Sequence, residues 1–286
     1  MNNKNKLIIS VGIIIIFLLA FNTEYLISVS KSKIINSAVE EIPSTVPLNT
    51  YPIIFLHGYN PIYSERISEY SLKEMQSQLS FDLGYRNKGL ITDKTTCAEL
   101  SYSNSPITVR STYFDSFKVQ EIDDYSTSVA TIISRVIECT GTNKVDIITH
   151  SMGGIVMRNY LHNIDNSTVR KLIMLGTPNQ GGLYNIGELA NLPKNNSKYN
   201  FDFMQLSEEH YFLKSLNKEN EIKNIDYYTI AGNKDGKGDG LVLVESVALE
   251  NAKNYIVPCG HIALRKPILC PKSYKIVKDI FLEVDS

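Results

Sequence analysis

The sequence predicts an α/β domain with a mostly parallel central sheet flanked by helices. Short apolar runs typical of buried strands alternate along the chain with segments whose apolar residues recur at helical spacing. The chain has 286 residues, of which 43% are hydrophobic, enough for one large domain or at most two small ones. Lys and Arg number 29 against 30 Asp and Glu, a balance that does not favour nucleic-acid binding.

The first 30 residues are predicted to be an export segment. Lys4 and Lys6 precede an apolar run over residues 7–21 that contains one Ser and one Gly. This run lies between the length of a signal-peptide core, about 7 to 15 residues, and the roughly 17 to 25 residues of a membrane span. A signal peptide cleaved near Ser28-Val29-Ser30 and an uncleaved membrane anchor both remain open. In either case the lysines stay inside and the rest of the chain leaves the cytoplasm.

Residues 31–50 are predicted to be a linker, because they are polar and follow no sustained period. The folded domain is expected to cover residues 51–286. Its first strand is predicted at 53–56, a continuous apolar run that His57 and Gly58 end. A helical stripe over 72–79 follows and Gly84 closes it. Residues 81–106 are polar and are predicted to be an irregular insertion.

A second helix is predicted where apolar residues recur between 129 and 137, with Asp123 and Asp124 at its positive end and Gly141 as its stop. Short strands are expected after it, with a helix from Ser151 to His162 behind the first of them. The predicted strands are 145–148, 171–175, 226–231 and 255–257. Parallel sheets of this kind place their chemistry in the loops at the carboxyl ends of the strands.

Four cysteines in an exported chain favour disulfides, since the count is even. The preferred pairing is Cys97 with Cys139 and Cys259 with Cys270, because the latter two lie eleven positions apart in a loop-rich segment. Buried free thiols are the alternative. The spacing contains no Cys-x-x-Cys element, so a structural zinc site is not predicted, and no other metal site is assigned.

The segment Thr149-His150-Ser151-Met152-Gly153-Gly154 stands between a predicted strand and a predicted helix. It resembles the nucleophile elbow of the α/β-hydrolases, in which a serine sits on a tight strand-to-helix turn. Gly153 supplies one of the small residues that such a turn needs, whereas Thr149 replaces the usual first glycine. The resemblance implies the α/β-hydrolase fold with Ser151 as the nucleophile. An ordinary Gly-rich turn is the alternative.

The same family places its acid and its base after the nucleophile, in that order. His261 follows a short strand and occupies the position expected of the base, while the other four histidines lie at a strand end, beside the nucleophile but pointing elsewhere, in a helix, or before any plausible acid. Asp239, in an Asp-Gly-Leu-Val segment, resembles the acid, and Asp235 is the alternative. The pattern around these aspartates also suggests calcium, but it lacks the spacing of an EF-hand loop.

The resemblance also covers the donors to the oxyanion that forms during acyl transfer. The backbone amides of Met152 and Tyr59 occupy the two positions that the family uses, with His57 and Gly58 as structural support. Residues 175–182 resemble the Gly-Thr-Pro segment that follows the elbow in lipases. Arg158 also fits the family pattern, and its expected role is structural, as an ion pair or a helix-surface cation.

Residues 183–217 fall where these enzymes insert a cap or lid. The segment interleaves aromatic and polar residues, so it could cover an acyl-binding groove or pack as an outer helix on the core. The sequence alone does not choose between the two, and it assigns no substrate-binding residue.

Together these motifs imply a secreted or membrane-anchored serine hydrolase similar to bacterial triacylglycerol lipases and esterases. Its partners would be lipids or other acyl esters, with possible membrane association, and it would need no cofactor. Two alternatives on the same triad are acyl transfer to an alcohol and cleavage of a thioester or a lipid-anchor ester. A catalytically silent relative that binds a lipid or a protein is the third.

Overall fold

The computed structural model describes residues 50–59, 70–92, 94–100, 106–114, 120–184 and 211–283. The expected export segment, nearly all of the expected linker and most of the expected cap or lid lie outside the described residues. In the part of the chain that is described, no helix combines the length and the apolar character needed to cross a membrane.

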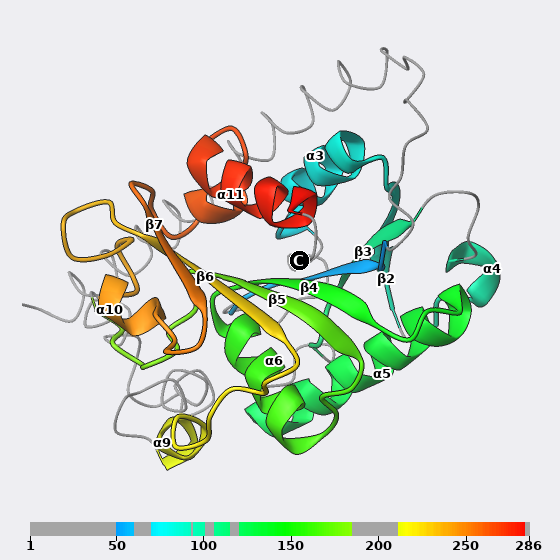
Figure 1. Cartoon of the computed structure of the whole chain (residues 1–286), viewed down its shortest axis with the longest axis horizontal. Helices are drawn as coiled ribbons and strands as arrows, with labels where there is room; N and C mark the ends of the chain where they lie inside the picture. Colours follow the sequence, from blue (N-terminus) through cyan, green and yellow to red (C-terminus); the bar gives the residue numbers. More distant parts are fainter. Residues whose placement is uncertain are drawn as a thin grey trace, which may run out of the picture. The chain divides into compact units, whose positions relative to one another are not determined.

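Seven parallel strands form a single sheet in the order β2-β3-β1-β4-β5-β6-β7 (Figure 1). The strands are β1 (Ile53–Leu56), β2 (Arg86–Ile91), β3 (Ile107–Ser111), β4 (Val145–His150), β5 (Val169–Leu175), β6 (Asp226–Gly232) and β7 (Lys253–Val257). β1 and β4 are adjacent at the middle of the sheet, although about ninety residues separate them in the chain. The predicted α/β class with a parallel sheet is confirmed.

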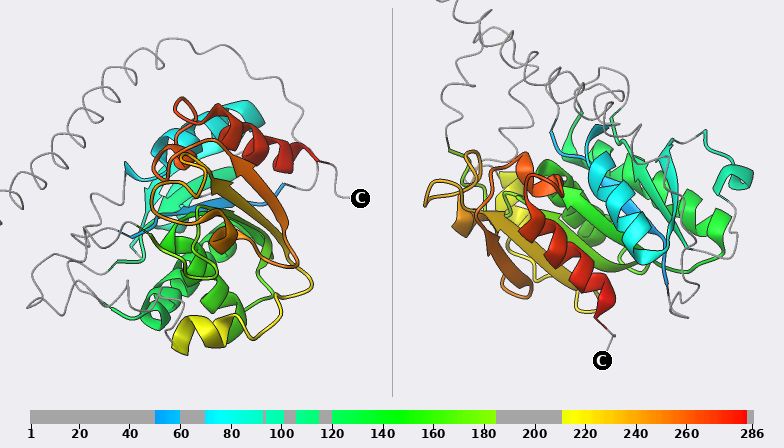
Figure 2. Two further views of the ribbon diagram at one scale, coloured as in Figure 1. Left: turned by 90° about the vertical axis from the view of Figure 1, so that its left-hand side faces the viewer. Right: turned by 90° about the horizontal axis from the view of Figure 1, so that it is seen from above.

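Helices cover both faces of this sheet (Figures 1 and 2). On one face lie α3 (Lys73–Leu83) and α11 (Pro271–Leu282); on the other lie α5 (Ile122–Thr140), α6 (Met152–Asn163) and α9 (Tyr211–Leu216). The shorter helices are α4 (Cys97–Leu100), α10 (Val244–Val247) and the 3₁₀ turn η1 (Ala263–Arg265). The predicted stops Gly84 and Gly141 end α3 and α5 with φ of 72° and 69°.

The continuous apolar run of β1 divides between two cores. Ile54 and Leu56 pack on the side of α5 and α6, whereas Ile53 and Phe55 pack on the side of α3 and α11. All four side chains are at most 1% exposed. A central strand of a parallel sheet is buried on both faces, which explains why its sequence shows no alternation between apolar and polar residues.

The prediction of an irregular insertion over residues 81–106 is wrong. The segment contains the end of α3, the strand β2 and the helix α4. β2 has the sequence RNKGLI and lies at the edge of the sheet, where only Ile91 is buried. An edge strand carries few apolar residues, so its composition resembles that of a loop. The structure also adds β3, which the sequence pattern did not indicate.

The predicted disulfide pairing is confirmed. Cys97 in α4 is bonded to Cys139 near the end of α5, with Cα atoms 4.7 Å apart. Cys259 is bonded to Cys270 across the loop between β7 and α11, with Cα atoms 6.0 Å apart. Disulfides persist in oxidising compartments, so the two bonds indicate a domain outside the cytoplasm.

The expected cap or lid segment covers residues 183–217. Its C-terminal end, which contains α9, packs as an outer helix. Leu213 and Leu216 of α9 are buried against the core on the side of α6. At the other end of the segment, Leu183 forms an isolated bridge with Val242. The stretch from 185 to 210 is outside the described residues, so a cap or lid over it stays a prediction.

Removing the cysteines in pairs is expected to destabilise the domain more for the longer loop than for the shorter one, because the entropy of loop closure grows with the logarithm of loop length. The Cys97–Cys139 bond spans 42 positions and the Cys259–Cys270 bond spans 11. Loop-closure entropy gives about 4 kcal/mol for the first bond and about 3 kcal/mol for the second. Urea unfolding of the two double Cys→Ala variants, compared with the oxidised parent, measures both losses. A larger loss from the shorter loop would contradict the entropic explanation.

Candidate active site

Ser151 lies on a sharp turn between β4 and α6. Its backbone has φ 55° and ψ −130°, a conformation that residues with a side chain rarely adopt. The Ser151 amide donates to the carbonyl of Leu175 in β5 at 2.8 Å, and α6 begins at the next residue. The helix N-terminus therefore lies directly behind the serine, where its dipole favours developing negative charge.

The residues packed most closely around this turn are glycines, because a side chain at these positions would collide with neighbouring atoms. A Cβ atom at Gly58, just after β1, would lie 2.7 Å from the Cβ of Ser151. At Gly153 it would meet the carbonyl oxygen of His57, and at Gly154 it would meet the side chain of Thr177. The loops after β1 and β5 therefore press on both sides of the serine. The predicted need for small residues around Ser151 agrees with these contacts.

Thr149 occupies the position where the elbow pattern has its first glycine. Its side chain is fully buried, and its hydroxyl donates to the carbonyl of Ile173 in β5 at 3.3 Å. The neighbouring strand thus satisfies the extra hydroxyl, which explains how the turn accommodates a branched residue.

Asp239 and His261 form a buried pair. Nδ1 of His261 lies 2.7 Å from Oδ2 of Asp239, and the two residues are 9% and 3% exposed, His261 being the more exposed. The other carboxylate oxygen accepts the backbone amides of Leu241 and Val242 at 2.9 and 2.8 Å. The His261 amide also donates to the carbonyl of Asp239 at 2.9 Å. Because an ionised carboxylate only accepts, Nδ1 carries the proton and Nε2 is left as the basic nitrogen.

Asp235, the alternative acid, has a different role in the same loop. Its carboxylate is exposed and accepts the amides of Lys237 and Gly238 at 2.9 and 3.0 Å, together with the hydroxyl of Tyr184 at 3.0 Å. These amide bonds, followed by that of Tyr184, hold the pKa of Asp235 below its usual range. Asp235 shapes the turn, whereas Asp239 reaches the imidazole.

Ser151 and the Asp239–His261 pair both lie beside the carboxyl end of β5. The Ser151 amide is bonded to Leu175, and the next residue along β5, Gly176, has φ 59°. A Cβ atom at Gly176 would lie 3.1 Å from Oδ2 of Asp239 and 3.2 Å from Nδ1 of His261. The structure thus brings the three predicted residues to one edge of the sheet. No direct hydrogen bond joins the Ser151 hydroxyl to the His261 ring; such bonds often tighten only when substrate binds.

His150 holds the backbone of His261. The expectation that His150 points away from this region is wrong. Nε2 of His150 donates to the carbonyl of His261 at 2.9 Å, and the ring centroids are 4.6 Å apart. Burial lowers the pKa of His150 well below its ordinary value, and the nearby His261 and Arg265 add to the effect. His150 is therefore neutral and serves as a hydrogen-bond donor beside the serine.

The two expected oxyanion donors are near Ser151. Met152, fully buried, is the first residue of α6, and Tyr59 follows Gly58, whose Cα faces the Ser151 side chain. Amides at the first turn of a helix have no partner within that helix, so the Met152 amide is available to an anion.

His57 supports the loop that carries Tyr59, as expected. Nδ1 donates to the carbonyl of Gly58 at 2.7 Å, so Nε2 accepts from the hydroxyl of Thr112 at 2.9 Å. The ring stacks on Tyr113 with centroids 4.2 Å apart, and the Tyr113 hydroxyl donates to the His57 carbonyl. Burial lowers the pKa of His57 to about 4, against the opposing effect of the bond to Gly58. His57 therefore stays neutral.

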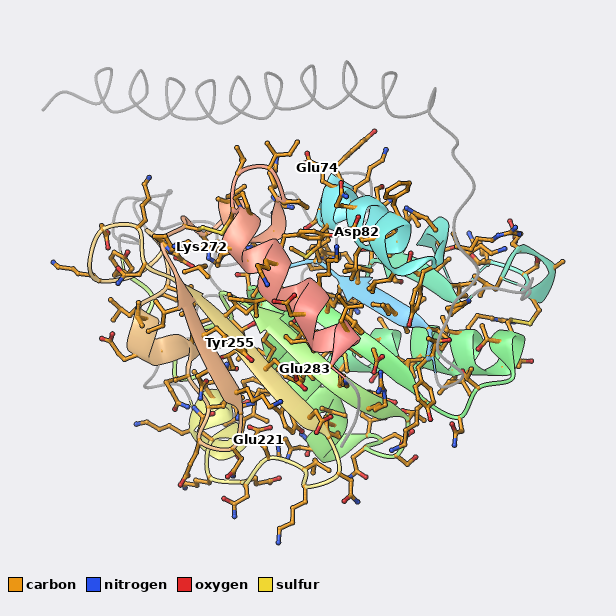
Figure 3. All side chains as sticks on the ribbon, turned by 45° about the horizontal axis from the view of Figure 1, so that its top comes forward. Glu74, Asp82, Glu221, Tyr255, Lys272 and Glu283 are labelled. Carbon is orange, nitrogen blue, oxygen red and sulfur yellow. A yellow bond between two sulfur atoms is a disulfide. The ribbon has the colours of Figure 1, made fainter. Side chains whose placement is uncertain are left out.

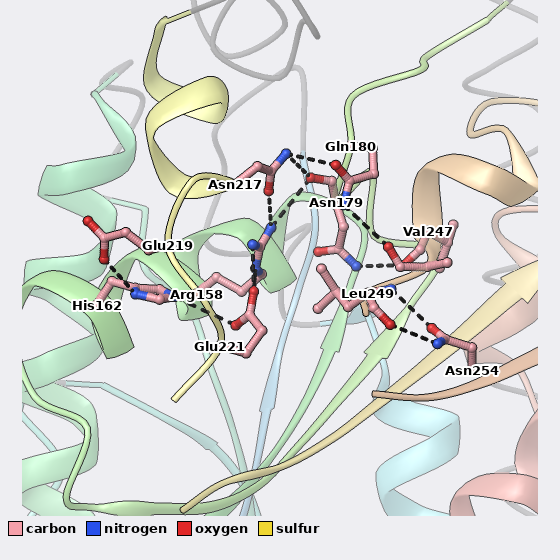
Figure 4. A network of polar contacts seen from close by, with 11 residues as sticks. Arg158, His162, Asn179, Gln180, Asn217, Glu219, Glu221, Val247, Leu249 and Asn254 are labelled. Carbon is pink, nitrogen blue, oxygen red and sulfur yellow. Dashed lines mark hydrogen bonds and ion pairs between the residues drawn. The ribbon is translucent and has the colours of Figure 1, made fainter. Parts of the chain in front are cut away.

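Arg158, on α6, belongs to a network of polar contacts (Figure 4). Its guanidinium is 1% exposed and lies 2.6 Å from Glu221, so it forms an ion pair and is not a surface cation. It also donates to Asn217 at 3.0 Å and to the carbonyl of Asn179 at 3.4 Å. These contacts join α6, the loop after β5 and the end of α9, which fixes the helix behind Ser151.

Among the described residues, no group of three or more His, Cys, Asp or Glu side chains could hold a metal ion. The suggestion of calcium near Asp235 gains no support, since backbone amides of its own turn occupy that carboxylate.

A parallel seven-stranded sheet with a serine on a left-handed turn between β4 and α6 is the arrangement of an α/β-hydrolase. The family described as "Alpha/beta hydrolase of unknown function (DUF915)" matches residues 42–253, and the chain belongs to it. The predicted family is therefore confirmed. No curated protein sequence matches the chain.

Solved structures share this fold at low sequence identity. The mature lipase BlEst2 of Bacillus licheniformis is 20% identical, with a TM-score of 0.51 over 83% of this chain and 96% of that chain. The lin2722 product of Listeria innocua is 18% identical, with a TM-score of 0.54 over 83% and 96%. The Pyrococcus furiosus esterase Pf2001 is 16% identical, with a TM-score of 0.50 over 81% and 82%. These similarities show the fold.

The contacts of His162 with Glu219 and Glu221, shown in Figure 4, predict how the free energy of unfolding depends on pH. The carboxylate of Glu221, 3.6 Å from Nε2 of His162, raises the pKa of His162 against the opposing effect of burial. A raised pKa stabilises the fold below the unfolded value of about 6.5, and this contribution disappears as the pH rises through the folded value. The stability advantage of the parent over His162→Gln should therefore be greatest below about pH 6 and should shrink as the pH rises through the folded pKa of His162. Urea unfolding measures it; equal pH profiles for the two proteins would contradict the assignment.

Proposed function

We propose that this chain is an exported serine hydrolase that cleaves carboxylic esters through an acyl-enzyme, in the manner of lipases and esterases. The observation that carries the proposal is the buried Asp239–His261 pair, which lies against Gly176 beside the strained turn of Ser151. In this assignment Ser151 is the nucleophile, His261 the base and Asp239 the residue that orients it. The domain would follow the export segment of residues 1–30 as a secreted or membrane-anchored protein.

The reaction proceeds in two halves on this geometry. Ser151 Oγ attacks the ester carbonyl carbon, and its proton passes to Nε2 of His261. Asp239 stabilises the resulting imidazolium, because Nδ1–H already points to its carboxylate. The amides of Tyr59 and Met152 donate to the oxyanion. When the C–O bond breaks, the alcohol leaves with the proton from Nε2. Water, deprotonated by the same nitrogen, then releases the acid and restores Ser151.

The Ser151–His261 separation must be closed by a small movement, since no direct hydrogen bond joins them. Side-chain rotation of Ser151 is available, because its backbone is fixed by the bond to Leu175 while its hydroxyl is at the end of a single torsion. His261 has less freedom, since its amide, its carbonyl and its ring are each hydrogen-bonded.

A fluorophosphonate probe tests the nucleophile directly. The folded protein is expected to form a covalent adduct on Ser151, and the Ser151→Ala variant should show none while keeping its unfolding transition. Mass spectrometry of the intact protein and of its peptides reads the adduct. Hydrolysis of short and long acyl esters, with and without a competing alcohol, then separates hydrolysis from acyl transfer. Folded protein that is not labelled at any pH at which it stays folded would favour a silent binding protein.

The two aspartates of one loop provide a matched comparison. Asp239→Asn is expected to lower kcat on the order of 10³- to 10⁴-fold, because the amide no longer fixes the imidazole tautomer. Asp235→Asn should leave most of the activity, since the Asp235 carboxylate bonds only to its own turn and to Tyr184. Initial rates on one soluble ester, with unfolding curves for both variants, measure the difference. If Asp235→Asn were the more damaging, the acid would be reassigned.

A further inference from the structure

An apolar loop tip follows the proposed catalytic histidine. Within the described residues, few large hydrophobic side chains are exposed, and three of them lie between Cys259 and Cys270. Ile262 is 42% exposed, Ile268 is 64% exposed and Leu269 is 56% exposed. The Cys259–Cys270 disulfide closes this loop. Exposed aliphatic residues gathered next to a site indicate a surface that meets another apolar phase.

The start of α3 adjoins this loop. Arg265 donates to the hydroxyl of Ser71 at 2.7 Å, and Lys266 lies 3.8 Å from Glu74. Tyr70, at this end of α3, is 44% exposed, and the ammonium of Lys73 lies 5.3 Å from the centroid of its ring. The apolar tip is therefore part of a broader surface that also presents an aromatic ring and a lysine.

The surface is also positive. Residues 259–275 contain four basic residues and no acidic residue, in a chain whose net charge is −1. Within the part of the chain that the structure describes, two carboxylates pair with them from outside this stretch: Glu74 on α3 with Lys266, and Asp279 with Lys275. Lys73 and Lys272 are both exposed, and Figure 3 shows Lys272 at the start of α11, at the opposite end from Glu283. Cations around aliphatic residues are the pattern that binds anionic lipid headgroups.

We propose that this surface docks the domain on an anionic lipid layer. The lipid-docking surface consists of Ile262, Ile268, Leu269 and Tyr70, with the exposed Lys73 and Lys272 around them. Ile268 and Leu269 enter the acyl region and the lysines meet the headgroups. Because Ile262 directly follows His261, docking brings the proposed catalytic residues to the lipid surface. The inference rests on the proposed function for its purpose, but the docking itself does not depend on catalysis.

The chain contains no tryptophan, so one introduced tryptophan reports its own surroundings in the full-length protein. Ile268→Trp places the probe on the lipid-docking surface. Leu282→Trp is the matched control, because Leu282 is 58% exposed at the far end of α11. With phosphatidylglycerol vesicles, the indole of the Ile268→Trp protein is expected to shift its emission to shorter wavelength and to be quenched by brominated acyl chains. The indole of the Leu282→Trp protein should do neither, even if the N-terminal segment holds the whole chain on the vesicle.

A second variant tests how much the lysine charge contributes to lipid binding. Adding Lys272→Gln to the Ile268→Trp protein should weaken insertion into phosphatidylglycerol vesicles about fivefold at low salt. The effect should fade at high salt, and with phosphatidylcholine vesicles it should be absent. Equal insertion into both lipids would overturn the anionic preference.

Three outcomes would overturn the proposal. If the indole of the Ile268→Trp protein stays in water with every vesicle, lipid docking at this loop is excluded. If the indole of the Leu282→Trp protein is quenched equally, the loop has no special contact with the lipid. An emission shift without vesicles that grows with protein concentration would assign the surface to a second copy of the chain. Repeating the insertion test in Ser151→Ala, with soluble-ester rates measured for Ile268→Trp, separates failure of docking from failure of the proposed chemistry.

Discussion

The candidate site depends on one steric constraint, the close approach of three loops around Ser151. β1, β4 and β5 are neighbours in the sheet, so the loops that follow them emerge side by side. Gly58 and Gly153 let the first two loops touch, and Gly176 leaves room for the Asp239–His261 pair on the third. A side chain at any of these positions would push the nucleophile away from the groups that are proposed to activate it. The order of strands therefore decides which residues can meet, and the glycines decide how closely.

The core of this arrangement was readable from the sequence because burial leaves a clear pattern. The central strands are apolar runs, α5 has a regular stripe, and Gly84 and Gly141 mark helix ends. β2 and β3 were not readable. β2 lies at the edge with mostly exposed residues, and β3 includes Arg110 and Ser111, whose polar side chains are buried through tertiary contacts with distant residues. Patterns within a short window cannot anticipate such contacts.

The candidate site, like the fold, could be predicted only in part from the sequence. Ser151, Asp239 and His261 could be selected because they follow predicted strands in the order that the family uses. The sequence favoured Asp239 over Asp235 through its Asp-Gly-Leu-Val segment, and in the structure the hydrogen bonds distinguish the two, since Asp239 bonds to the imidazole of His261 and Asp235 to amides of its own turn. The role of His150 was missed for a similar reason: its partner is the backbone of a residue 111 positions away. No residue type in the sequence reports a bond to a distant carbonyl.

The Cys259–Cys270 bridge has a consequence for how the protein matures. The covalent ring that it closes contains His261 as well as most of the apolar part of the lipid-docking surface, so one oxidation event limits the freedom of both. A newly made chain with reduced thiols lacks this restraint. Under the proposed function, this bridge would restrain the loop that carries the proposed base only after the chain has reached a thiol-oxidising compartment.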